Sequence, residues 1–205
     1  MSTFADKYGP WALVTGASSG IGAEFVRQLA SRGLNIVLAA RRREPMESLA
    51  GEVSNKHGIE TRVVAVDLAK PDFLSSLRGA TGDIEVGLLV NNAGFGTAGD
   101  FLENTLEREL AVIDVNCRAA VILAHEYGRT MVERGRGGII FVASIMAFLS
   151  APHTTGYAAS KGHNLQYGEA LYYELKPKNV DVIALCPGAT RTEFQEVSGM
   201  TGEYP

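Results

Sequence analysis

Cysteine and histidine are scarce in this chain of 205 residues, which contains two cysteines and four histidines. Cys117 and Cys186 are too few to build a disulfide framework, and neither has a metal-ligand neighbour at short spacing. The four histidines are scattered along the sequence. We therefore expect a reduced, cytoplasmic protein without a metal centre.

Long apolar runs and blocks of basic residues are also lacking. No apolar run reaches the ~18 residues that a membrane span requires. The N-terminal "MSTFADKYGP" does not have the charged-then-apolar order of a signal peptide. The formal net charge is −4, and the densest basic cluster, "RRR" at 41–43, is too short for a nucleic-acid tract. We expect neither a membrane span nor nucleic-acid binding.

The remaining composition is that of an ordinary globular protein, with 46% hydrophobic and 20% charged residues. The chain is long enough to bury a substantial core, and its length is typical of one domain. It shows no internal repeat, low-complexity segment or linker. We expect residues 1–205 to form a single domain.

Apolar strands and amphipathic helices alternate along the chain. Strand-like runs lie at 11–16, 35–40, 61–67, 86–92, 138–144 and 180–186. Helical spacing is found at 23–33, 44–58, a segment ending near Arg78, roughly 105–134, and 157–176. This order predicts an α/β fold with a parallel, doubly wound sheet covered on both faces. Ligands of such sheets bind at the carboxyl ends of the strands, where this chain has Gly16, Arg41, Asp67, Asn92, Ser144 and Pro187.

The run "TGASSGIG" (15–22) follows the first predicted strand. Gly16 permits a tight turn, and Gly20 and Gly22 let backbone and ligand approach closely. The next helix begins here, and its free N–H groups and dipole suit a pyrophosphate. The spacing is G-x-x-x-G-x-G rather than the commoner G-x-G-x-x-G, and an ordinary glycine-rich turn could have the same letters.

Tyr157 and Lys161 are four positions apart, so a helix places both side chains on one face. A phenol loses its proton near pH ~10, and a nearby cation lowers that pKa toward working pH. The pair is therefore a candidate acid/base catalyst. Taken alone, a surface tyrosine lying over a lysine stem explains the same spacing.

Several motifs together resemble the short-chain dehydrogenases/reductases in order and spacing. They are "TGASSGIG", "NNAG" (91–94), Asn116, Ser144, the Tyr157–Lys161 pair and "PG" (187–188). The resemblance covers essentially the whole chain. It implies a Rossmann-type sheet, a nicotinamide dinucleotide cofactor and an active site at these residues.

The resemblance also implies a role for each catalytic residue. Tyr157 exchanges a proton with the substrate oxygen, and Lys161 lowers the tyrosine pKa and bonds the nicotinamide ribose. Ser144 holds the carbonyl oxygen, and Asn116 holds a water that links Lys161 to solvent. Ser144 could instead simply end its strand, and Asn116 could be an ordinary helix-interior amide.

The cofactor residues follow from the same resemblance. Asp67 is expected near the adenine, although alone it reads as a helix N-cap. Arg41 and Arg42 follow Ala40, where an NAD-preferring site usually has an acidic residue, so we expect NADP(H) to be preferred over NAD(H); a solvated basic turn is the alternative. The full expected set is Gly16, Ser18, Ser19, Gly20, Ile21, Gly22, Arg41, Arg42, Asp67, Leu68, Asn92, Ala93, Gly94, Tyr157, Lys161, Pro187, Gly188 and Thr190, with Thr192 as a weaker candidate.

The sequence departs from the family pattern in two places. The first is Ala143, where the family often has a serine, followed by Met146 and Phe148, with Leu149 and His153 nearby. These bulky residues predict an apolar substrate, unless they only fill the core. The second is the end of the chain, because the family commonly continues past "PG" with a covering loop, a helix and a seventh strand. We expect either a natural chain that extends beyond Pro205 or a sixth strand covered by a partner subunit.

These observations lead to one expected function and two rivals. The expected function is that of an NADP(H)-dependent oxidoreductase that interconverts a carbonyl and an alcohol. Its sequence looks most like the branch with ketoacyl- and hydroxysteroid-type reductases, and the family commonly forms homodimers or homotetramers through 105–134 and the helix after Tyr157. One rival is a non-catalytic sensor of NADP(H). The other is a sugar-nucleotide epimerase or dehydratase, whose relatives usually carry a longer substrate domain.

Overall fold

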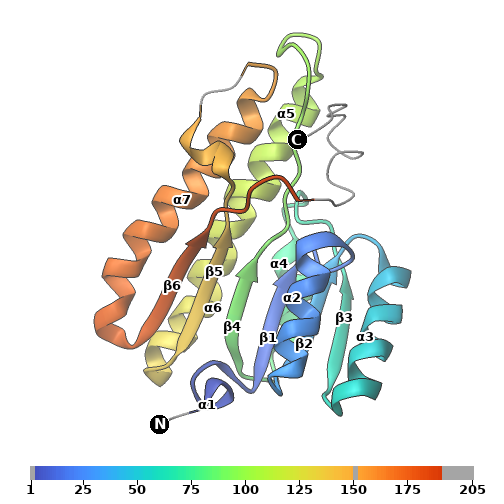
Figure 1. The fold of residues 1–205 in the computed structure, drawn as a ribbon, viewed down its shortest axis with the longest axis vertical. Helices are drawn as coiled ribbons and strands as arrows, with labels where there is room; N and C mark the ends of the chain where they lie inside the picture. Colours follow the sequence, from blue (N-terminus) through green and yellow to red (C-terminus); the bar gives the residue numbers. More distant parts are fainter. Residues whose placement is uncertain (1–2, 150–151, 191–205) are drawn as a thin grey trace.

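One parallel sheet organises the protein (Figure 1), as seen in a computed structural model that describes residues 3–149 and 152–190. The strand order is β3-β2-β1-β4-β5-β6. The chain therefore moves outward from β1 to β3, crosses back to β4 and continues to β6, which is the doubly wound order that the alternation predicts. The strands are β1 (Trp11–Thr15), β2 (Asn35–Ala40), β3 (Thr61–Ala65), β4 (Val86–Asn91), β5 (Gly137–Val142) and β6 (Val180–Leu185). Each lies within two residues of its predicted bounds.

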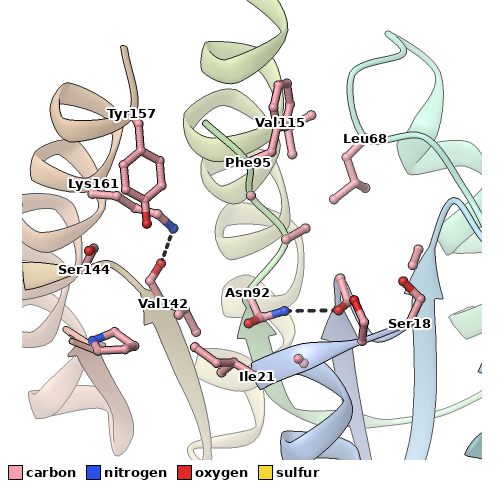
Figure 2. A pocket seen from close by; sticks show the side chains of 18 of the residues that line it. Ser18, Ile21, Leu68, Asn92, Phe95, Val115, Val142, Ser144, Tyr157 and Lys161 are labelled. Carbon is pink, nitrogen blue, oxygen red and sulfur yellow. Dashed lines mark hydrogen bonds between the residues drawn. The ribbon is translucent and has the colours of Figure 1, made fainter. Parts of the chain in front are cut away.

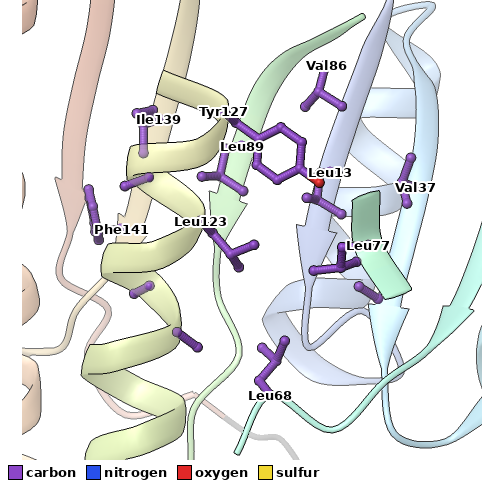
Figure 3. Packing of buried hydrophobic residues seen from close by; sticks show 14 of the residues in the cluster. Leu13, Val37, Leu68, Leu77, Val86, Leu89, Leu123, Tyr127, Ile139 and Phe141 are labelled. Atoms are coloured by element: carbon purple, nitrogen blue, oxygen red, sulfur yellow. The ribbon is translucent and has the colours of Figure 1, made fainter. Parts of the chain in front are cut away.

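Helices cover both faces of the sheet, because successive strand residues point to opposite sides. Leu13 of β1 packs in one cluster with residues of α4 (Phe73–Thr81), α6 (Ala119–Arg134) and α7 (Thr155–Leu175). Figure 3 shows this side, with Leu77 of α4 and Leu123 of α6 lying over the strands. The neighbouring residue Val14 packs on the opposite face with α2 (Gly20–Ser31) and α3 (Arg43–His57).

The predicted long helix at 105–134 is not one regular α-helix. It consists of α5 (Leu106–Ile113), a π-helical turn η1 (Asp114–Arg118) and α6. The widened turn contains Asn116, whose side chain bonds to a loop residue, Phe95. A π-turn inside a helix is frequently found at a functional site, and the apolar spacing of the sequence does not reveal it.

Three further elements were not predicted. A short helix α1 (Phe4–Tyr8) precedes β1, and single turns η2 (Ile145–Phe148) and η3 (Lys176–Lys178) follow β5 and α7. Helix α1 is tied to the last strand, since the Tyr8 hydroxyl donates to Asp181 at 2.5 Å. Within the described parts of the chain, each helix is too short or too polar to cross a lipid bilayer.

Candidate functional site

A cavity of about 620 Å³ opens at the carboxyl ends of the strands. It is lined by the ends of β2 and β5, by the segments that follow β1, β3 and β4, and by the start of α7, and Figure 2 shows several of these residues facing one another. All the described residues that the sequence assigns to the cofactor lie in this wall, and so does Ser144. Thr192 lies outside the described residues. The fold therefore brings these residues, which are far apart in the sequence, together in one cavity.

The glycines of the first turn form a cradle that no side chain could share. Gly16 and Gly20 have φ angles of 65° and 54°, in the left-handed region that favours glycine. A Cβ on Gly22 would lie 2.2 Å from the carbonyl oxygen of Gly16. Helix α2 begins at Gly20, and Ser19 at its N-cap makes no side-chain capping bond. The N-terminal N–H groups of α2 are therefore suited to a phosphate, and the cradle fits the pyrophosphate of a dinucleotide.

Asn92 fixes the cradle from the neighbouring strand. Its side-chain Nδ2 donates to the carbonyl of Thr15 at 2.8 Å. The hydroxyl of Thr15 accepts from the backbone N–H groups of Asn92 and Ala93, each at 3.0 Å. A Cβ on Gly16 would meet Nδ2 of Asn92 at 2.8 Å. Asn92 thus holds the ends of β1 and β4 together while also lining the cavity.

Two arginines and an aspartate follow β2 and β3. The guanidinium of Arg42 donates to the hydroxyls of Ser18 at 3.4 Å and Ser19 at 3.2 Å, so it leans over the first turn. Arg41 lines the same wall, and both arginines are exposed. Asp67 accepts from the N–H of Ala69 at 3.1 Å. It closes a local turn and is not the N-cap of α4, because Asp72 holds that position.

Tyr157 and Lys161 lie in the first turns of α7, and both side chains are buried, with exposed fractions of 9% and 4%. The ammonium of Lys161 lies 5.6 Å from the centre of the Tyr157 ring and donates to the carbonyl oxygen of Val142 at 2.7 Å (Figure 2). Ser144 follows β5, and its hydroxyl accepts from the N–H of Met146 at 3.1 Å. The exposed-pair interpretation of Y-x-x-x-K is therefore wrong.

The burial of Lys161 has an electrostatic consequence. Removal from water disfavours the charged ammonium and lowers the pKa of Lys161 to about 8, although the nearby Cys117 and Cys186 act in the opposite direction. Burial also raises the pKa of the Cys117 thiol, so this cysteine stays neutral at pH 7. Lys161 still carries its charge at pH 7, and the charge lies in a poorly hydrated place.

Asn116 supports the site from outside the cavity wall. Its amide spans the backbone of Phe95, accepting from the N–H at 3.1 Å and donating to the carbonyl at 2.9 Å. It also donates to the hydroxyl of Ser160 at 2.9 Å, which in turn donates to the carbonyl of Tyr157 at 2.7 Å. Asn116 therefore joins the loop after β4 to the helix of Tyr157. Its water-holding role stays a prediction.

The substrate side of the cavity differs in part from the expectation. Met146 lines the wall, but Phe148, Leu149 and His153 do not, and Phe148 is 66% exposed. The wall also includes residues that the sequence did not suggest, among them Phe95, Ala111, Val115, Ile145 and Thr154. Ala111 and Val115 are four residues apart, so they lie on the same face of the predicted long helix. This spacing is the signal that could have identified them.

Comparison with known proteins finds relatives over most of this chain. The family model described as short chain dehydrogenase matches residues 10–201. The chain is similar to a 7beta-hydroxysteroid dehydrogenase of Collinsella aerofaciens, with 33% identity over 187 residues, 91% of this chain and 71% of that protein. It is also similar to the human protein named inactive hydroxysteroid dehydrogenase-like protein 1, with 34% identity over 184 residues, 88% of this chain and 56% of the relative.

A solved structure shares the fold as well as the sequence pattern. It is a short-chain dehydrogenase from Sphingobium yanoikuyae in complex with NADPH, which superposes with a TM-score of 0.89 at 33% identity over 93% of this chain and 75% of that one. The chain spans between 55% and 72% of the length of the curated relatives it matches. With a matching family model over residues 10–201 and the same Rossmann-type sheet, the chain belongs to the short-chain dehydrogenase family.

Proposed function

We propose that this protein interconverts a carbonyl compound and an alcohol with a nicotinamide dinucleotide, using Tyr157 as the acid/base. The observation that carries the proposal is the convergence of Ser144, Tyr157 and Lys161 on one cavity whose other end is the glycine cradle. A nucleotide site without chemistry has no use for a phenol beside a buried ammonium. Membership of a dehydrogenase family supports the same reaction class.

The chain's own residues divide the work. A bound dinucleotide would supply the hydride for reduction and accept it in oxidation. Gly16–Gly22 would hold its pyrophosphate, and Pro187 and Gly188 would lie at its nicotinamide end. Ser144 holds the substrate oxygen, and Tyr157 gives that oxygen a proton during reduction or takes it during oxidation. An ammonium has three N–H donors. One donor of Lys161 reaches Val142, which leaves two that would serve the cofactor ribose. The ammonium lies 5.6 Å from the centre of the Tyr157 ring, where its positive charge favours the phenolate.

The cofactor that we propose is NADP(H) in preference to NAD(H). The end of β2 has Ala40 in place of an acid, and Arg42 reaches across to Ser18 and Ser19. A guanidinium there matches a 2′-phosphate, whereas an acid would repel it. The NADPH complex of the Sphingobium yanoikuyae relative supports this choice.

We expect Arg42→Ala to narrow the difference in affinity between NADPH and NADH by about tenfold, the low end for a charge-assisted hydrogen bond because the arginine is exposed. Arg41→Ala should narrow it in the same direction. Arg43→Ala is the matched control, since Arg43 pairs with Glu47 at 3.3 Å and not with the first turn. Fluorescence titrations with both cofactors give the measurement. Equal wild-type affinities for NADPH and NADH would contradict the preference.

We propose an apolar, bulky ketone or the corresponding alcohol as the substrate. Phe95, Val115, Ile145 and Met146 give the cavity an apolar wall beside Tyr157. The hydroxysteroid dehydrogenase named above acts, by its name, on a molecule of this kind. A screen of aliphatic, acyl and steroid ketones, followed by NADPH absorbance, should give the highest kcat/KM for the bulky ketones. Faster turnover of small polar ketones would contradict this substrate class.

A non-catalytic binder of NADP(H) is the second candidate, and the human relative named as inactive favours it. Its prediction for the same screen is NADPH binding without oxidation by any ketone.

For the assembly, we propose a homodimer or homotetramer, because Leu106, Leu110 and Ile113 form an exposed apolar stripe on α5. A monomer by light scattering would contradict it. The cytoplasmic location stays a prediction.

A further inference from the structure

Glu109 of α5 is an acidic side chain buried beside the site. Its exposed fraction is 8%, whereas its neighbours Arg108 and Leu110 are exposed. Among the residues that the structure describes, none forms an ion pair or hydrogen bond with the Glu109 carboxylate. A carboxylate in such a place costs free energy unless something nearby compensates its charge.

The carboxylate lies against the first turn of α7. Its Oε2 is 2.6 Å from the position that a Cβ on Gly156 would take. The hydroxyl of Thr97, a residue with an exposed fraction of 2%, is 3.9 Å from the same point. Gly156 is the second residue of α7 and directly precedes Tyr157. Glu109 therefore contacts the backbone that carries the candidate acid/base.

The first turn of α7 has no acidic residue of its own. At its start, the backbone N–H of Ala158 donates to the carbonyl of Thr154, the N-cap residue, at 2.9 Å. The side chain of Thr154 makes no capping hydrogen bond. The helix is 21 residues long, so the positive end of its dipole is fully developed here. Glu109 brings a carboxylate to this turn from α5, across the α5–α7 contact.

Tyr157 is thereby enclosed from two sides. On one side, a Cβ on Gly96 would lie 3.2 Å from Cβ, Cγ and Cδ2 of Tyr157, so the loop after β4 lies against the ring. On the other side, Glu109 and Thr97 lie against Gly156, the residue that precedes it. We propose that Glu109 is a positioning residue, which fixes the N-terminus of α7 and so sets the place and the protonation of Tyr157. This inference rests on the proposed role of Tyr157.

Glu109→Gln keeps the shape and removes the charge. We expect kcat to fall by between about tenfold and 10²-fold, as for a small misplacement of a catalytic group, with KM for the ketone little changed. The loss of a negative charge favours the phenolate, so kcat/KM for alcohol oxidation should rise at a lower pH than in the wild type. Glu109→Asp keeps the charge and should keep the wild-type pH profile. Glu107→Gln, an exposed glutamate of the same helix, is the matched control.

The other charged groups around Tyr157 are unchanged in these variants. In the described parts of the chain they are Lys161 on α7 and, farther out, Arg108 on α5, whose guanidinium lies 6.0 Å from the Phe95 ring, and the Asp100–His153 pair at 2.8 Å. The thiols of Cys117 and Cys186 interact with Lys161 and are also unchanged. The turn η2 contributes none. A shift in the pH profile of Glu109→Gln therefore reports on Glu109 itself.

A second experiment does not depend on turnover. In the cofactor-free protein, amide hydrogen exchange at 155–158 should be faster in Glu109→Gln than in Glu107→Gln. In addition, Gly156→Ala places a Cβ against Oε2, so its effect on kcat should be smaller in a Glu109→Ala background than alone. Unchanged exchange together with additive effects would overturn the inference.

The two proposals fail in different ways. If Tyr157→Phe keeps wild-type turnover, the proposed function is wrong, and the exchange measurement still decides the contact between Glu109 and α7. If Tyr157→Phe is inactive but Glu109→Gln matches Glu107→Gln in kcat, pH profile and exchange, only the positioning role is overturned. Circular dichroism and Tm show whether each variant is folded.

Discussion

Replacing Tyr157 by phenylalanine should reduce turnover by about 10²–10⁴-fold, the usual contribution of general acid–base catalysis. The substitution removes one hydroxyl and keeps the ring, which packs against Gly96 and lies above the Lys161 ammonium. The cavity wall therefore keeps its shape, and we expect the affinity for NADPH to change little. Steady-state kcat with a bulky ketone, together with a fluorescence titration of NADPH, measures both quantities.

Tyr173→Phe is the matched control for this variant. Tyr173 belongs to the same helix but is 75% exposed and far along it from the cavity. Its substitution should leave kcat and NADPH affinity at wild-type values. A Tyr157→Phe protein with near wild-type kcat would show that another group transfers the proton.

Replacing Lys161 by methionine should change the pH dependence of stability as well as abolish most turnover. Burial lowers the pKa of Lys161 from 10.5 to about 8. Between these two values the unfolded chain holds a proton that the folded chain has released, so the wild type becomes more stable as pH rises through this window. Each unit of pKa corresponds to about 1.36 kcal/mol, which gives an expected gain of roughly 3 kcal/mol between pH 7 and pH 10.5.

Methionine has no charge to bury, so the variant should lack this gain. Urea unfolding of cofactor-free wild type and Lys161→Met at pH 7, 9 and 10.5 gives the free energies of unfolding. The variant also loses the hydrogen bond to Val142. This loss is the same at every pH, so it does not change how the difference in free energy of unfolding between wild type and variant depends on pH. Lys178→Met, at an exposed lysine, is the control and should follow the wild type. A wild-type-minus-variant difference that stays flat over this range would contradict the costly burial of the ammonium.

The strands and the nucleotide cradle could be predicted because their causes are local. Residues 36–40 are apolar and follow the turn residue Gly33, and β2 spans Asn35–Ala40 as predicted. Glycine at 16, 20 and 22 is required by backbone angles and by contacts within the same turn, so its spacing shows in the sequence. The alternation of strands and helices then left few topologies, and the observed sheet order is the expected one.

The π-turn and the wall of the cavity depended on contacts between distant segments. Asn116 bonds to Phe95, 21 residues earlier, and no helical periodicity contains that information. Likewise Arg42 lies over Ser18 and Ser19, while Arg43 pairs with Glu47. Three consecutive arginines look alike in the sequence, and only the direction in which the chain leaves β2 separates them.

Glu109 shows most clearly where the sequence ends and the tertiary structure begins. In "TLEREL" both glutamates look like a solvated helix surface, and Glu107 is exposed as that pattern predicts. Glu109 is buried because α5 packs against the first turn of α7, 46 residues later. There Gly156 leaves space for a carboxylate, and the helix dipole favours its negative charge. The sequence by itself determined the family, the sheet and the residues of the proposed acid/base pair. The packing of the two helices decided which charges surround that pair, because burial and distance set the free energy of a charge and neither is a property of local sequence.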